Sequence, residues 1–149
     1  MTVTFFGHTD FLGTAEYERK MLTLLDEVVG CSAADFYLGG IGGFDSFAYD
    51  CCKKYKQTHS NARLIFVTPY MTEDYQRAHL KRQREMYDEI IYPEIEDKPI
   101  RFAILYRNKW MVDQADVIIC AVAHAWGGAY KACKYATDKK KRTLNLINS

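Results

Sequence analysis

The stretch from Tyr37 to Tyr49 constrains the fold of this chain more than any other part of the sequence. Apolar residues run into four glycines that only Ile41 interrupts, and the apolar residues after them recur at helical spacing. This order predicts a strand, a glycine turn and a helix. Glycines leave the outward-pointing amide groups at the start of such a helix bare, so that an anionic group can approach them. The turn therefore indicates either a phosphate site or only a tight connection between strand and helix.

A second glycine cluster favours the phosphate site. It lies at Trp126 to Tyr130, after an apolar run from Val117 to Val122, and the two clusters together contain six of the nine glycines. Two such turns at neighbouring strand ends can hold a ligand with two phosphates, or with a phosphate and a ribose. We therefore expect a nucleotide-derived small molecule as the partner.

Strands alternate with helices along the whole chain, which predicts a single α/β domain over residues 1–149. The expected architecture is a doubly wound, mostly parallel Rossmann-like sheet of about five to seven strands with helices on both faces. The predicted strands span residues 3–6, 35–38, 63–67, 86–92, 116–122 and 143–147, and the predicted helices 14–30, 44–55, 100–114 and 127–138. The polar segment 70–84 is either a helix with a solvated face or a lid over the strand ends.

Charge and cysteine content narrow the classes of partner. The formal net charge is +1, and the densest basic run, Lys139 to Arg142, is typical of a solvated helix end, so we do not expect nucleic acid as a partner. Five cysteines without a C-x-x-C pair indicate small core residues rather than a disulfide framework or a zinc site. The lack of a secretory leader pattern and of membrane-spanning segments predicts a reducing, cytoplasmic setting and no membrane partner.

The residues that the predicted core leaves unused collect at the carboxyl ends of the strands. Ligands of open parallel sheets bind outside these ends, near the point where the strand order reverses. The predicted ligand-binding residues are His8, Thr9, Gly39, Gly40, Gly42, Gly43, Phe44, Asp45, Thr68, Arg107, Asn108, Met111, His124, Trp126, Gly127, Gly128, Ala129 and Tyr130.

Several of these residues have two interpretations. Arg107 either grips a phosphate through two parallel hydrogen bonds or lies on the surface of its helix. Trp126 either stacks on a base or seals its helix against the sheet. The histidines bind a ribose, act in acid–base chemistry or cap strand ends, and Asp45 is a helix N-terminal charge or a ribose ligand.

Other chemistries lack their motifs. The four histidines are dispersed without metal-ligand spacing, which predicts no metal site. The sequence has no G-x-S-x-G hydrolase elbow, and its glycine turns match neither the phosphate loop of NTPases nor the dinucleotide fingerprint. We therefore predict no cofactor.

The motifs together resemble the SLOG superfamily, the Rossmann-like group that includes the LOG phosphoribohydrolases and the DNA-processing protein A fold. The resemblance covers nearly the whole chain, at residues 5–8, 39–46, 67–70, 107–113 and 126–131. LOG enzymes pair an R-K-x-x-M helix motif with a P-G-G-x-G-T-x-x-E loop. Arg107 and Met111 match the first motif, with Asn108 in place of its lysine, but Trp126 replaces the proline and Lys134 lies where the glutamate would be. A lysine cannot stabilise a ribosyl cation as a carboxylate can, so we predict no catalytic residues.

These observations lead to three hypotheses. In the first, the protein binds a nucleotide-derived signal such as ADP-ribose, cyclic ADP-ribose or a cyclic nucleotide without catalysis and sequesters it, as a phage-borne sponge against host defence would. The alternative is a LOG-like phosphoribohydrolase that cleaves the N-glycosidic bond of a nucleoside monophosphate. A DNA binder similar to DNA-processing protein A is the third hypothesis, which the near-zero net charge opposes. A homo-oligomer, dimer or tetramer, is expected from the resemblance and from apolar residues near Tyr87 and Tyr92.

Overall fold

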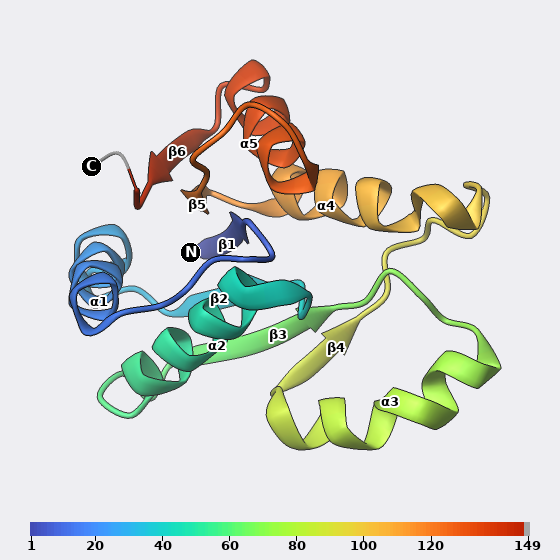
Figure 1. Ribbon diagram of the computed structural model, residues 1–149. Helices are drawn as coiled ribbons and strands as arrows, with labels where there is room; N and C mark the ends of the chain where they lie inside the picture. Colours follow the sequence, from blue (N-terminus) through green and yellow to red (C-terminus); the bar gives the residue numbers. More distant parts are fainter. Residues whose placement is uncertain (148–149) are drawn as a thin grey trace.

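Over residues 1–147, which the computed structural model describes, six parallel strands form one sheet (Figure 1). The strands are β1 (Thr2–Gly7), β2 (Ala34–Leu38), β3 (Ala62–Val67), β4 (Glu89–Ile91), β5 (Val117–Ala121) and β6 (Arg142–Asn145). Their order is β4-β3-β2-β1-β5-β6, so the chain moves outward from β1 to β4 and then crosses to β5 on the other side of β1. The order therefore reverses between β1 and β5, which is where open α/β sheets bind ligands.

Helices cover both faces of the sheet, which confirms the predicted doubly wound α/β fold (Figure 1). The helices are α1 (Ala15–Val29), α2 (Gly42–Lys56), α3 (Glu73–Met86), the short 3-10 helix η1 (Ile100–Phe102), α4 (Ala103–Gln114) and α5 (Gly128–Asp138). One core lies between the sheet and α1 and α2, and a second lies on the opposite face beneath α4 and α5. Among the described residues, no helix combines the length and the apolar character that crossing a bilayer requires.

Capping residues explain where α1 begins and ends and where α3 begins. Thr14 caps α1 by accepting a hydrogen bond from the amide of Tyr17, and Gly30 ends the helix in the left-handed region, at φ 59°. Thr72 caps α3 in the same way. The segment 70–84 thus forms a helix from Glu73 onward, beside the edge strand β4, although none of its residues is fully buried.

Two expectations about packing were wrong. Tyr87, from the apolar group that suggested an oligomer, packs inside the chain, where its ring contacts Phe66 and Tyr49. Cys120 of β5 and Cys133 of α5 form a disulfide, although we expected only core cysteines. The turn between β5 and α5 folds the helix back over its own strand, which brings together two cysteines that lie 13 residues apart in the sequence.

Candidate functional site

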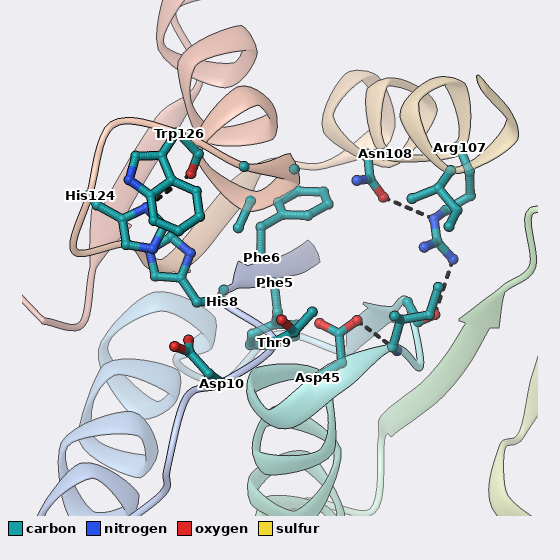
Figure 2. Close-up of a pocket in the computed structure, with 17 residues that line it drawn as sticks. Phe5, Phe6, His8, Thr9, Asp10, Asp45, Arg107, Asn108, His124 and Trp126 are labelled. Atoms are coloured by element: carbon teal, nitrogen blue, oxygen red, sulfur yellow. Dashed lines mark hydrogen bonds between the residues drawn. The ribbon is translucent and has the colours of Figure 1, made fainter. Parts of the chain in front are cut away.

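A cavity of about 290 Å³ opens at the carboxyl ends of β1 and β2, beside the point where the strand order reverses (Figure 2). The cavity brings together eleven of the eighteen predicted ligand-binding residues from five separate parts of the chain. These are His8, Thr9, Gly39, Asp45, Arg107, Asn108, His124, Trp126, Gly127, Gly128 and Ala129.

Seven predicted residues do not line this cavity: Gly40, Gly42, Gly43, Phe44, Thr68, Met111 and Tyr130. Phe44 and Met111 are completely buried in the two cores. Thr68 is also buried, and its hydroxyl donates a hydrogen bond to the carbonyl oxygen of Tyr70. The side chains of Phe44, Thr68 and Met111 are therefore used by the protein interior rather than by the cavity.

Three amides of the first glycine turn, where we expected bare backbone, already have acceptors within the chain. These hydrogen bonds run from Gly43 to the Thr9 carbonyl (2.8 Å), from Phe44 to the His8 carbonyl (3.3 Å) and from Ile41 to a carboxylate oxygen of Asp45 (2.9 Å). A Cβ atom on Gly42, whose φ is +86°, would lie 2.8 Å from the Cα of Thr9. The glycines therefore allow the segment after β1 to pack closely against the turn. This packing favours a tight connection between strand and helix over a phosphate site.

The second glycine turn does offer free backbone. The amides of Gly128, Ala129 and Tyr130 have no hydrogen-bond acceptor within residues 1–147, and α5 starts without a side-chain cap. No atom lies within 4 Å of the position that a Cβ would take on Gly127 or Gly128. The positive end of the α5 dipole and its unpaired amide groups thus face open space at the cavity, an arrangement that attracts anions.

Three aromatic rings stack in a column along one wall of the cavity (Figure 2). The ring centroids of His8 and His124 are 3.7 Å apart, and those of His124 and Trp126 are 3.6 Å apart. Trp126 ends the column and is 69% exposed, so it does not seal α5 against the sheet. An exposed indole fixed by stacking is a platform on which a nucleobase can stack.

Each of the two histidines makes a hydrogen bond that fixes the role of one ring nitrogen. Nε2 of His8 accepts a hydrogen bond from the amide of Ala123 (2.9 Å), so this nitrogen carries no proton. Burial, and then the neighbouring His124, lower the pKa of His8, which keeps its ring neutral. Nδ1 of His124 lies 3.1 Å from the carbonyl oxygen of Trp126 and donates to it. Both imidazoles therefore serve to hold the indole in place.

Arg107 lies at the opposite wall and is 2% exposed, which excludes the surface position that we considered. Its Nη1 donates to the carbonyl oxygens of Gly39 (3.1 Å) and Val67 (2.6 Å), and its Nε donates to the side-chain oxygen of Asn108 (2.9 Å). Within the described chain, no carboxylate lies within 4 Å of the guanidinium group. The arginine therefore joins the ends of β2 and β3 and places a positive charge beside the cavity, which the charge of Asp45 offsets at longer range.

Asp45 gives the cavity a charge that depends on pH. Removal of its carboxyl group from water raises the pKa to about 6, while the amide of Ile41 and the charge of Arg107 act in the opposite direction. At neutral pH the carboxylate is ionised and repels an anionic ligand. Below pH 6 it becomes neutral, and the net charge of the cavity becomes more positive.

Phe6 and Ile104 also line the cavity, although sequence reasoning did not select them. Ile104 is four residues before Asn108, so helical spacing places both on one side of α4. That spacing was the signal that could have identified it. Phe6 carried no such signal, because an apolar residue in a buried strand is expected to belong to the core.

The fold is similar to that of DNA processing protein A from two bacteria. The Helicobacter pylori protein, whose structure concerns its single-stranded DNA binding mode, matches with a TM-score of 0.63 and 20% identity over 96% of this chain and 63% of that chain. The Streptococcus pneumoniae protein matches with a TM-score of 0.64 and 13% identity over 95% of this chain and 48% of that chain. The chain therefore spans about half to two thirds of their length. No family model and no curated protein matches the sequence.

These similarities confirm the Rossmann-like α/β fold, and because one of the similar structures concerns single-stranded DNA binding, they contradict our expectation that nucleic acid is not a partner. The exclusion used the net charge of the whole chain, which hides an uneven distribution. Residues 100–149 carry nine lysines and arginines against three aspartates, a net charge of +6, whereas residues 1–99 carry eleven against sixteen acidic residues, a net charge of −5. The part of the chain that forms α4 and α5 is therefore strongly basic, as a polyanion-binding surface requires.

Proposed function

We propose that this protein binds single-stranded DNA and that one nucleotide lies in the cavity between Trp126 and Arg107. The observation that carries the proposal is the column of stacked rings that ends in the exposed indole of Trp126. Every base has a π-face, so stacking on an indole retains single strands without regard to sequence and contributes about 1–3 kcal/mol per base.

The surroundings of Trp126 suit the rest of a nucleotide. The unpaired amides of Gly128 and Ala129 follow the indole directly in the chain, where they can donate to phosphate oxygens. Arg107 adds a positive potential at the far wall without contacting a carboxylate. The similarity of the fold to a protein with a single-stranded DNA binding mode supports this assignment.

A second candidate is binding and sequestration of a free nucleotide-derived molecule of the ADP-ribose, cyclic ADP-ribose or cyclic nucleotide type. One observation favours it: the stacking platform and the anion-binding helix end belong to the same cavity of about 290 Å³. A free nucleotide could therefore make all its contacts there without a neighbouring nucleotide. Sequestration of this kind would suit a sponge that protects a phage from host signalling.

Fluorescence anisotropy with labelled oligothymidylate tests the first proposal. Trp126→Ala should weaken binding by about 1–3 kcal/mol, a roughly 5- to 150-fold rise in Kd. Leu12→Ala is the matched control, because Leu12 is 82% exposed and apolar but does not line the cavity. Absence of binding by the unmodified protein, or equal binding by Trp126→Ala, would refute DNA binding at this site. Displacement of the oligonucleotide by ADP-ribose at far lower concentrations than by thymidine monophosphate would favour the second candidate.

A further inference from the structure

A basic depression lies between α4 and α5, outside the cavity described above. Its volume is about 320 Å³, and its walls contain four lysines, one tyrosine and one aspartate. These are Lys109, Lys131, Lys134, Tyr135, Asp138 and Lys139. We refer to this surface as the α4–α5 depression.

Most of the lysine charge in the α4–α5 depression is not neutralised. Lys134 forms an ion pair with Asp138 (3.2 Å), but within residues 1–147 no carboxylate lies within 4 Å of Lys109, Lys131 or Lys139. The three lysines without an ion pair repel one another, and a polyanion in the depression would relieve that repulsion.

An aromatic ring holds two of these lysines in place. The ammonium groups of Lys109 and Lys139 lie 5.5 Å and 5.4 Å from the centroid of the Tyr135 ring. The hydroxyl of Tyr135 donates to a carboxylate oxygen of Asp113 (2.8 Å), which fixes the ring between the two helices. The positive charges are therefore presented from an ordered surface rather than from freely moving side chains, which reduces the entropy lost on binding.

On α5, the lining of the α4–α5 depression begins at Lys131, two residues after the last cavity residue of that helix, Ala129. Lys131 is in the first turn of α5, and its amide donates to the carbonyl of Gly127, which lines the cavity. Lys131 and Lys139 are eight residues apart on the helix, or about 12 Å along its axis. This span exceeds the size of one phosphate group, so the charges suit a chain of phosphates better than a single anion.

We propose that the α4–α5 depression binds the phosphodiester backbone of the nucleotides adjacent to the one in the cavity. The inference rests on the proposed function and adds the direction in which the strand leaves the site, from Trp126 along α5 toward Lys139. It also assigns a length dependence: an oligonucleotide should bind more tightly than a mononucleotide because only the oligonucleotide reaches the lysines.

The test compares a double variant, Lys131→Ala with Lys139→Ala, with the control Lys53→Ala with Lys81→Ala. The control removes the same charge from α2 and α3, outside both surfaces. The affinity for oligothymidylate is measured at a series of salt concentrations, and the affinity for thymidine monophosphate is measured at one salt concentration. Each lost phosphate contact makes the slope of log K against log salt shallower by about 0.7 for a single strand.

The expected result is a slope shallower by about 1.4 for Lys131→Ala with Lys139→Ala, no change for the control, and unchanged affinity for thymidine monophosphate. An unchanged slope in the first variant, or an equal change in the control, would overturn the inference. If the unmodified protein binds oligothymidylate and Trp126→Ala weakens that binding, such a result would leave the proposed function intact. No binding by the unmodified protein would remove both.

Discussion

Asp45 is the residue through which pH should control ligand affinity. Its pKa of about 6 means that the carboxylate is ionised at neutral pH. The carboxylate lines the same cavity as the N-terminal end of α5, where we propose that phosphate binds. We predict that affinity for oligothymidylate rises as the pH falls from about 7.5 to about 5, since protonation removes a negative charge from the site. Titrations across this range should show the rise, and Asp45→Asn should bind more tightly at pH 7.5 and lose the part of the dependence centred on pH 6. An identical profile in Asp45→Asn would contradict the assignment of the pH dependence to Asp45.

The same carboxyl group should also affect stability. Its pKa in the folded protein is above the ordinary value of 3.8, so its contribution to stability is fully present below pH 3.8 and is lost as the pH rises through 6. The Asp45→Asn variant has no carboxyl group to ionise at this position, so it does not lose stability as the pH rises. The amide oxygen of its new side chain still accepts the hydrogen bond from the amide of Ile41. We predict that above pH 6 it is more stable than the unmodified protein, by up to about 3 kcal/mol. Urea unfolding at pH 5 and at pH 7.5 would measure the difference, and a stability gain that is equal at both pH values would contradict the explanation.

At the scale of elements, Arg107 joins α4 to the ends of two strands. Its guanidinium supplies the donors for the carbonyls of Gly39 and Val67, and the side chain is almost fully buried. Arg107→Ala would leave these carbonyls unpaired and a cavity behind them, so we predict a loss of about 2–5 kcal/mol in the free energy of unfolding. Urea denaturation would measure it. Arg101→Ala is the control, because Arg101 is exposed in η1 and should change stability by less than about 0.5 kcal/mol.

Substitution of glycine by alanine should lower stability in the first glycine turn and lower ligand affinity in the second. The Cβ of an alanine at position 42 would lie 2.8 Å from the Cα of Thr9, and the backbone there has a φ of +86°, which side chains disfavour. Gly42→Ala should therefore lower stability by about 1–3 kcal/mol. Alanine at Gly128 meets no atom within 4 Å and occupies the first residue of α5, so stability should be unchanged. Its methyl group would nevertheless lie beside the free amides and weaken oligothymidylate binding. Thermal unfolding and anisotropy on both variants separate the two roles, and equal stability losses would contradict the distinction.

At the scale of the whole molecule, the sequence was sufficient to predict the fold, but not to predict which amide groups are hydrogen-bonded or which partners the charge distribution suits. Alternating strands and helices predicted the parallel sheet, and strand-end positions predicted most of the cavity. The hydrogen bonds of the Gly43 and Phe44 amides could not be predicted, because their acceptors, the carbonyls of Thr9 and His8, are more than 30 residues away in sequence. The error about nucleic acid had a different cause: a total charge of +1 averages over two oppositely charged parts of the chain.

The disulfide between Cys120 and Cys133 should influence the stability of the whole molecule, because it fastens α5 to a central strand of the sheet. It closes a loop whose ends are 13 residues apart, and restricting the unfolded chain over such a loop contributes about 3 kcal/mol. We therefore predict that reduction lowers Tm by roughly 10 °C, since 1 kcal/mol corresponds to about 2–4 °C for a chain of this size. Thermal unfolding with and without a reductant would measure the shift, while thiol titration confirms that the bond is open.

Cys133→Ser is the control for this experiment, because its stability should be low from the start and insensitive to the reductant. The bond closes the loop that contains Trp126 and the free amides of α5, so reduction should also lower affinity for oligothymidylate if it lets α5 move relative to β5. An unmodified protein that keeps its Tm after full reduction would show that packing of Ala132 and Ala136 against the sheet holds α5 without the cross-link. Loss of stability with unchanged affinity would instead separate the attachment of the helix from the geometry of its first turn.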